Sequence, residues 1–412
     1  MAGFRCPGEF EIQSDVFVEW IPYSEPISGF NAYKSLVSIV KELTNEVNVH
    51  INCCPSVEGL YHECVNELKN GGVDVDKIHF TFFDADPDAF YFRDNGPNIL
   101  TDDEGNTRAI NTNWSFYGFY DPNDKLSLMS RLTGVHSAVC LNVTDIVDTD
   151  VVAEGGNRES NGQGVLMIVE QTEVELRNPT KSRDEIEMEY KRIFGAEKFI
   201  WIPRPMADDD DITIGPIDFK EDGTPVFGAS GAMHTDEMAR FIDESTILLA
   251  EVTDEEANSN MVSKENKKRL DDAYEAISKA TDINGNPFKI VRIPAAAHYE
   301  FVVSPGDEMF EGYCEAVGDK FQDGTPLYKD RDLHLYAATS YCNFLICNGV
   351  VLGQRYWQEG LDEKIKEKDL AAQKILQECF PDRKVVMIDS LALNLCGGGV
   401  HCWTRNAYVP SN

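Results

Sequence analysis

The feature that most constrains this fold is an alternation, along the whole chain, between short apolar runs and amphipathic segments. Ten runs, many of them rich in β-branched and aromatic residues, are bounded by turn residues and predict strands. They lie at 16–23, 47–53, 78–85, 138–143, 164–170, 198–203, 246–252, 288–294, 343–352 and 384–389.

Three segments between these runs predict helices that cover the strands. In 32–46, 264–281 and 361–380, apolar residues recur at the three- and four-residue spacing of one helix face. The expected buried positions are Leu36, Ile39, Val40 and Leu43 in the first segment, and Leu270, Tyr274 and Ile277 in the second. The order strand, helix, strand repeats to the end of the chain and predicts an α/β fold.

No Pro- or Ser-rich linker divides the 412 residues, so we expect a single domain over 1–412. Two polar segments, 205–225 and 301–334, are too long for plain connections and are typical of lids or insertions. A hairpin is expected at 217–232. The acidic run 208–211 lacks the spacing of a calcium loop, so we expect it to be a solvated loop.

The charge balance narrows the range of partners. With 71 acidic and 37 basic residues, the net charge is −34. Such a surface repels phosphate backbones and anionic lipids and attracts small cations, so we expect no nucleic acid and no membrane partner. The charge balance leaves open whether the protein forms a homodimer.

The compartment follows from the cysteines and the hydropathy. The 11 cysteines are scattered without a C-x-x-C pair, which favours free thiols in the cytoplasm over a disulfide framework. We find no apolar signal segment at the N-terminus and no run of 18 apolar residues, so we expect neither secretion nor a membrane span.

A glycine run, Gly397–Gly399, leads into His401 and Cys402. Glycine lets the backbone approach a ligand closely, and a thiol on such a loop beside basic groups is a candidate nucleophile. The alternative is a buried structural cysteine beside a turn. His401 is not expected to partner Cys402, because neighbours on an extended chain point in opposite directions.

Three further positions combine a polar side chain with a turn or a glycine pair. His234 and Asp236 are two residues apart and could enter one pocket together, although a surface turn is equally compatible. Asp94 precedes a turn signature and follows aromatic residues, which suits recognition of a planar cation or, alternatively, an Asx turn. Glu154 ends an apolar run before two glycines, where it could orient a histidine, hold a cation or lie in a hairpin.

Taken together, three carboxylates, a histidine and a cysteine suit chemistry on a guanidinium. Carboxylates bind this planar, five-donor cation in a bidentate manner. A thiolate could attack its central carbon, and a histidine could protonate the departing ammonia and then activate water. This chemistry requires no metal and no cofactor.

Five motifs resemble, in the same order, those of the agmatine deiminases and their porphyromonas-type peptidylarginine deiminase relatives: RDNGP, EGGN, HTDEMARF, SYCNFLICNGVVL and GGGVHCWT. The resemblance spans about residues 80–405 and implies a five-bladed α/β propeller. It implies that Cys402 is the nucleophile and His234 the general acid and base. By the same resemblance Asp94 and Asp236 hold the guanidinium, Glu154 holds His234 and Asn343 lines the pocket. Tyr91 stands where agmatine deiminases usually carry Trp, so the wall of the amine pocket differs.

The resemblance leads us to expect hydrolysis of agmatine to N-carbamoylputrescine and ammonia, a step toward putrescine, through an amidino-cysteine intermediate. Deimination of arginine in peptides and amidino transfer to an amine are alternatives. A non-catalytic propeller would not need the full set of residues, and a Cys–His protease would need an oxyanion hole instead of two carboxylates.

Overall fold

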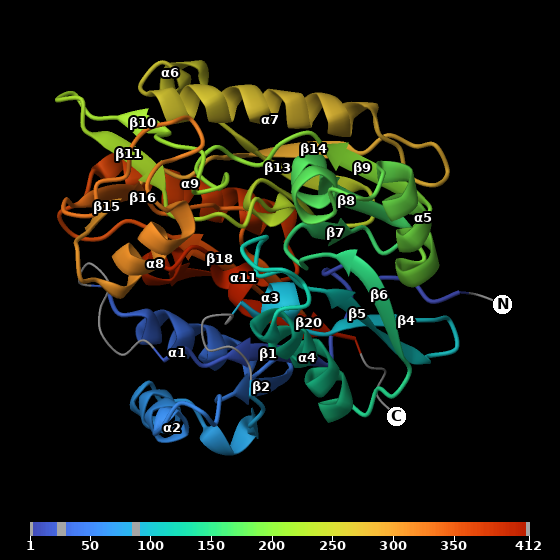
Figure 1. Cartoon of the computed structure of the whole chain (residues 1–412). Helices are drawn as coiled ribbons and strands as arrows, with labels where there is room; N and C mark the ends of the chain where they lie inside the picture. Colours follow the sequence, from blue (N-terminus) through green and yellow to red (C-terminus); the bar gives the residue numbers. More distant parts are fainter. Residues whose placement is uncertain (1–2, 23–29, 85–90, 409–412) are drawn as a thin grey trace.

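Small sheets, each of three or four strands, organise the computed structural model, which describes residues 3–22, 30–84 and 91–408. In the described part of the chain, five sheets share one topology (Figure 1). Each has an antiparallel pair of strands, then a crossover helix, then a strand parallel to the second. The prediction of an α/β fold is therefore confirmed.

Four of these units follow one another along the chain. The fifth combines strands from near the two ends of the chain. The first comprises β4 (Asn98–Thr101), β5 (Thr107–Asn113), α4 (Lys125–Cys140) and β6 (Ile146–Val152). The second comprises β7 (Arg158–Ser160), β8 (Val165–Val169), the π-helix Gln171–Arg177, α5 (Arg183–Phe194) and β9 (Lys198–Ile202). The third comprises β12 (Ala239–Phe241), β13 (Thr246–Glu251), α6 (Asp254–Ala257), α7 (Met261–Lys279) and β14 (Lys289–Pro294).

The fourth unit comprises β17 (Leu345–Cys347), β18 (Val350–Arg355), α9 (Glu363–Cys379) and β19 (Lys384–Asp389). The fifth comprises β20 (Thr404–Ala407), β1 (Asp15–Glu19), α1 (Ala32–Leu43), β2 (Asn48–Asn52), α2 (Leu60–Asn70), a 3₁₀ turn (Val75–Lys77) and β3 (Ile78–Thr81). Its strand β1 pairs with the last strand of the described chain, β20, in antiparallel register.

Most of the sequence predictions for these elements are confirmed. Nine of the ten strand-like runs contain strands, with Tyr23 and Ala85 at the ends of two runs lying outside the described residues. The four apolar residues predicted for the face of α1 are fully buried, as are Leu270 and Ile277 of α7. The prediction that Tyr274 is buried is wrong, because this residue is 45% exposed and its ring lies 5.4 Å from the Arg292 guanidinium carbon.

The predicted strand at 138–143 is also wrong, because these residues end α4 and form the turn after it. The buried side of α4 consists of small side chains, mainly Ser127, Ser130, Thr133 and Ser137. Its larger apolar residues, such as Leu132 and Val139, point outward. An apolar periodicity therefore could not reveal this helix.

The two long polar segments are not bare loops, because they pair with each other in a sixth sheet. The hairpin predicted at 217–232 is confirmed as β10 (Asp218–Phe219) and β11 (Pro225–Gly228). Strand β11 pairs in parallel with β16 (Leu333–Tyr336), which pairs with β15 (Glu300–Val303), and α8 (Glu308–Val317) lies between these two strands in sequence. The stacked rings of Phe227 and Phe321 join the two segments.

The acidic run at 208–211 is not solvated: Asp208, Asp209 and Asp210 are at most 5% exposed. Burial is possible because each carboxylate has a partner. These partners are Asn266 for Asp208, the backbone N–H of His234 for Asp209 and the Arg269 guanidinium for Asp210. The carboxylates of these three residues are therefore bound by partners inside the molecule and do not face solvent.

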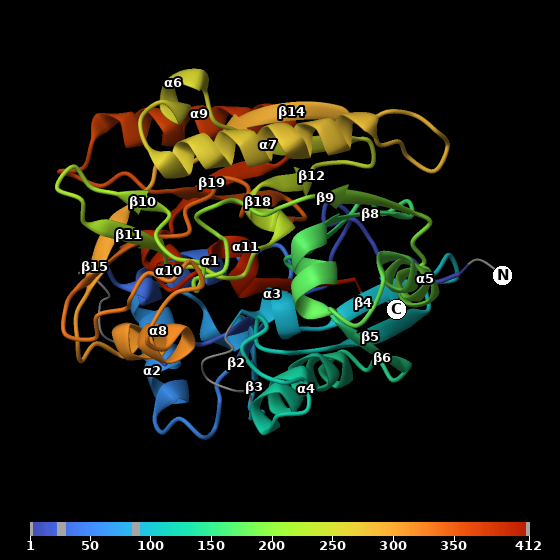
Figure 2. The same ribbon diagram turned by 45° about the horizontal axis from the view of Figure 1, so that its top comes forward.

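Three short helices bring the ends of the units together: α3 (Phe92–Asn95), α10 (Leu391–Leu395) and α11 (Val400–Trp403). In both views α3 and α11 lie in the middle of the molecule, while α7 runs along its outside (Figure 2). In the described part of the chain, no helix is long and apolar enough to cross a membrane.

Candidate active site

Helix α3 carries Asp94, which is 2% exposed. Its Oδ1 accepts a hydrogen bond from the backbone N–H of Gly156 (2.9 Å), and its Oδ2 accepts one from the Tyr117 hydroxyl (2.8 Å). Tyr117 and the residue before it adopt positive φ angles of 57° and 51°. Such conformations are costly for non-glycine residues and cluster at functional sites. The carboxylate is therefore held on two sides.

His234 lies directly before a 3₁₀ turn (Thr235–Glu237) and is fully buried. Its Nε2 lies 2.9 Å from Glu154 Oε2, and Glu154 is fixed by the Arg177 Nε at 2.7 Å. Its Nδ1 makes no hydrogen bond to any residue that the structure describes and lies 3.6 Å from Asp94 Oδ1. Burial opposes protonation, but Asp94, Glu154 and Asp236 together raise the pKa of His234 to about 9. The ring is thus an imidazolium at neutral pH with one nitrogen available.

Gly156 shows how closely three of these groups converge. A Cβ at this position would lie 2.6 Å from His234 Nδ1 and 3.0 Å from both Asp94 Oδ1 and Asp236 Oδ2. Only a residue without a side chain leaves that space open, which explains the second glycine of the EGGN motif.

Helix α11 places Cys402, 3% exposed, against the opposite side of Asp236. The Asn343 side-chain amide donates to Cys402 Sγ (2.9 Å), and Sγ lies 3.7 Å from both Asp236 Oδ2 and Glu237 Oε1. Burial, followed by the charges of Asp236, Glu237 and Asp94, raises the pKa of Cys402 well above its usual value. The ligand-free site therefore holds a thiol.

The glycine run before Cys402 is needed for close packing. A Cβ at Gly398 would lie 2.7 Å from the Tyr91 ring, and one at Gly399 would lie 2.5 Å from Asn343 Oδ1. The Tyr91 hydroxyl donates to the Cys396 carbonyl (2.7 Å), so Tyr91 forms the wall beside the loop. The seven residues singled out from the sequence thus surround one region.

His401 joins the site in a way that the sequence reasoning missed. Residues 400–403 are helical and not extended, and the His401 ring points to Asp236 (Nδ1 to Oδ2, 2.6 Å) and to Glu9 (Nε2 to Oε2, 2.7 Å). Burial opposes ionisation of Asp236, but His401 and then His234 lower the pKa of its carboxyl. His401 therefore acts on Asp236 instead of on the thiol.

Other members of the site were also missed. They are Glu9, Tyr117, Arg177, Asp209 and Glu237. Glu237 stands inside the HTDEMARF motif and could have been noticed there, whereas Glu9 lies 392 residues from its partner His401 and has no local signal. Burial, with Asp236 and Asp209, raises the pKa of Glu237 well above its usual value.

The site is built to receive a cation. Asp236, Glu237 and Cys402 offer ligand atoms within 4.8 Å of one another, which is the spacing of a possible metal site. Two of these atoms are already engaged, Asp236 Oδ2 by His401 and Glu237 Oε1 by Asn343. An organic cation with several N–H donors can share such carboxylates without displacing their partners.

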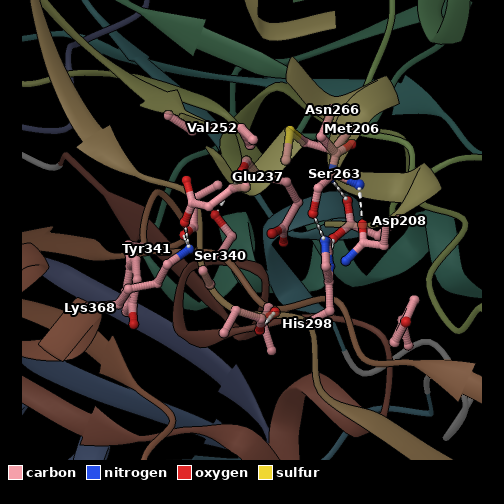
Figure 3. Close-up of a pocket in the computed structure, with 18 of the residues that line it drawn as sticks. Met206, Asp208, Glu237, Val252, Ser263, Asn266, His298, Ser340, Tyr341 and Lys368 are labelled. Atoms are coloured by element: carbon pink, nitrogen blue, oxygen red, sulfur yellow. Dashed lines mark hydrogen bonds and ion pairs between the residues drawn. The ribbon is translucent and has the colours of Figure 1, made fainter. Parts of the chain in front are cut away.

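A cavity of about 370 Å³ adjoins this site, and Glu237 forms part of its wall (Figure 3). On another wall, His298 Nε2 lies 3.1 Å from Ser263 Oγ, and its Nδ1 lies 3.2 Å from Asp208 Oδ2. Because Glu237 also lies 3.7 Å from Cys402 Sγ, its side chain stands between the thiol and the cavity.

Comparison with known proteins places this geometry in a family. The chain is 26% identical to an agmatine deiminase of Pseudomonas aeruginosa over 99% of this chain and 96% of that protein. It is 28% identical to a candidate agmatine deiminase of Selenomonas ruminantium over 98% of this chain and 95% of that protein.

Among solved structures, the agmatine deiminase of Enterococcus faecalis has the same mixed α/β fold, with a TM-score of 0.73, 22% identity and coverage of 98% and 96% of the two chains. The model of the Porphyromonas-type peptidyl-arginine deiminases matches residues 5–221 and 221–407. This match covers nearly the whole chain, and the protein therefore belongs to the Porphyromonas-type peptidyl-arginine deiminase family.

Proposed function

We propose that this protein is an agmatine deiminase, which hydrolyses the guanidinium of agmatine to N-carbamoylputrescine and ammonia. The observation that carries the proposal is the convergence of Asp94, Asp236 and His234 around Gly156, with Cys402 Sγ 3.7 Å from Asp236 Oδ2. Two carboxylates beside a thiol suit the binding of a planar cation that donates several hydrogen bonds. The names of relatives aligned over almost the whole chain support agmatine as the substrate.

In the proposed reaction, Asp94 and Asp236 accept N–H groups of the guanidinium, and Tyr117 and His401 hold these carboxylates in place. The thiol releases its proton to solvent once the bound cation offsets the carboxylates that raise its pKa. The Cys402 thiolate then bonds to the guanidinium carbon. His234 protonates the departing nitrogen, which leaves as ammonia, and an amidino-cysteine remains.

A water molecule completes the turnover. It attacks the amidino carbon and gives one proton to the now neutral His234. The carbon–sulfur bond then breaks, and the second proton of the water passes to the departing sulfur. The products are the ureido compound and the regenerated Cys402 thiol, so the overall change is addition of water and loss of ammonia. Glu154, fixed by Arg177, keeps the His234 ring oriented through both steps.

We also propose that the five units are the blades of a five-bladed α/β propeller formed by one domain over 1–412. Their shared topology and the pairing of β1 with β20 support this arrangement. The 11 free cysteines support a cytoplasmic location, where thiols stay reduced.

The test is ammonia release from agmatine, free arginine and a blocked arginine peptide, measured side by side with a Cys402→Ala control. We expect kcat/KM for agmatine to exceed that for free arginine by at least about 100-fold, equivalent to about 2.7 kcal/mol. The family model carries the name of peptidyl-arginine deiminases, so arginine in peptides is the second candidate. A blocked peptide that proves the best substrate would replace the first proposal with the second.

A further inference from the structure

A cluster of arginines lies behind the site, around a small cavity of about 50 Å³. The arginine cluster consists of Arg93, Arg158 and Arg405, contributed by α3, β7 and β20. Arg93 and Arg158 are 6% and 8% exposed. Asn98, at the start of β4, also lines the cavity.

Two of these guanidinium groups lack a carboxylate partner. Arg158 Nη2 and Arg405 Nη2 both donate to the same atom, Asn98 Oδ1. Neither arginine forms an ion pair with a carboxylate in the described part of the chain. Arg158 Nη1 is buried without a well-formed hydrogen bond to any described residue, and the nearby neutral Tyr190 hydroxyl, which donates to Glu173, brings it no negative charge.

The carboxylates that line the cavity are used elsewhere. Glu9 and Glu159 bind a fourth guanidinium, that of Arg240, at 2.9 and 2.8 Å. Glu9 also contacts Arg93 at 3.1 Å and His401 at 2.7 Å. Among the described residues, Arg158 and Arg405 are thus the two guanidinium groups of this cluster without an ion pair, and Glu173 acts on Arg158 only through the electrostatic field.

Unmatched charges of this kind are expensive to bury. Taking a cation out of water costs several kcal/mol unless an anion compensates it. Burial, then the charges of Arg93 and Arg158, lowers the pKa of Arg405 to about 9. An acidic protein with 71 Asp and Glu residues could have supplied another carboxylate, yet none of those that the structure describes forms an ion pair with these two groups.

We propose that the cavity binds a small free anion, of the size of a halide or formate, between the Arg158 and Arg405 guanidinium groups. The volume fits this class, because one water requires about 10–15 Å³ of such space and the cavity offers about 50 Å³. An ion of a few heavy atoms fits there, whereas a phosphorylated sugar does not.

The bound anion would stabilise the residues that support Asp94 and Asp236. Arg93 precedes Asp94 in sequence and contacts Glu9, which binds His401, which in turn binds Asp236. The cluster therefore reaches both carboxylates through two short chains of contacts. The proposal concerns binding and stability, so it does not depend on the reaction.

The first test is thermal unfolding of the whole protein in sodium gluconate, titrated with bromide at constant ionic strength. We expect a saturable rise in Tm of about 2 °C, because bromide binds only the folded state and gluconate is too large for the cavity. Arg158→Met and Arg405→Met should each lose this rise. Arg269→Met, which removes a buried arginine that has its own partner Asp210, should keep it.

Equal Tm values for the wild type in bromide and gluconate would overturn the proposal, as would a full bromide response in both cluster variants. A second measurement does not rely on variants that fold. Crystals of the wild type in saturating bromide should show anomalous scattering within contact distance of Arg158 and Arg405. A map without a peak there would also overturn the proposal.

Discussion

His234 and His401 are both buried among carboxylates, yet their surroundings differ in one respect. His234 uses one ring nitrogen, bound to Glu154, and leaves its Nδ1 without a hydrogen bond. His401 uses both, one bound to Asp236 and one to Glu9. A histidine that delivers and recovers a proton needs a ring nitrogen without another partner. Of these two rings, only His234 has such a nitrogen among the described residues.

The comparison teaches that burial and acidic neighbours do not by themselves identify the reactive histidine. The pKa of His234 is raised to about 9 by Asp94, Glu154 and Asp236 against the effect of burial. His401 instead favours the ionised form of Asp236. In the proposed mechanism, the His234 ring moves a proton, and the His401 ring maintains the charge of Asp236.

The largest expected effect falls on the thiol that lies beside Asp236. Cys402→Ser should lower kcat by about 10⁴-fold or more, because a hydroxyl is a far weaker nucleophile than a thiolate. Ammonia release measures the loss, and circular dichroism should show an unchanged fold. Rapid-quench mass spectrometry of the wild type should find an amidino adduct on the peptide that contains Cys402. An adduct on a different cysteine would contradict the assignment.

The next effect tests the free nitrogen directly. His234→Gln should lower kcat by about 10²- to 10³-fold, which is the usual contribution of a general acid and base. Single-turnover kinetics should show that both formation and hydrolysis of the adduct become slower. If only one of the two steps slows, His234 does not serve both.

A smaller effect is expected at the histidine whose nitrogens are both engaged. His401→Gln should lower kcat about 10-fold and should destabilise the protein by about 3 kcal/mol, because two buried carboxylates lose a shared partner. Urea unfolding measures the second effect. A loss of kcat as large as that of His234→Gln, without a loss of stability, would invalidate the distinction between the two rings.

The smallest effect concerns stability above neutral pH. The pKa of His234 in the folded protein, about 9, lies above its unfolded value of about 6.5. Its contribution is therefore complete below pH 6.5 and is lost as pH rises through 9. Between pH 8 and 9.5 the wild type should lose about 1 kcal/mol more than His234→Gln. Urea titrations at the two pH values check this, and parallel losses would mean that the ring is not charged when buried.

The sequence predicted best those features whose pattern lies within a short stretch of the chain. The apolar face of α1 and the strand runs are local patterns, and the structure has them. Motifs that combine a glycine with a polar residue correctly indicated residues that meet in space. Gly156 of the EGGN motif, for example, lies against Asp94 and His234 in the folded chain.

Several of the failures involve partners that are remote in sequence, and one involves local composition. The acidic run is buried because Asn266 and Arg269 of α7 meet it, and no local rule predicts that. Glu9 reaches His401 from the other end of the chain. The buried face of α4 is made of serines and threonines, so the usual hydrophobic signal was absent.

The pairing of β1 with β20 has a consequence for biosynthesis. Because domains generally fold from the N-terminus as the chain leaves the ribosome, β1 emerges early but lacks its neighbour until residues 404–407 have been made. Cys402 and His401 arrive in the same few residues, directly before β20. A nascent chain that stops before them already contains Asp94, Glu154, His234 and Asp236, yet it has neither the thiol nor the strand that completes its first sheet. The proposed nucleophile is thus made only just before the strand that completes the sheet, so chains that stop earlier contain these acidic residues without the thiol.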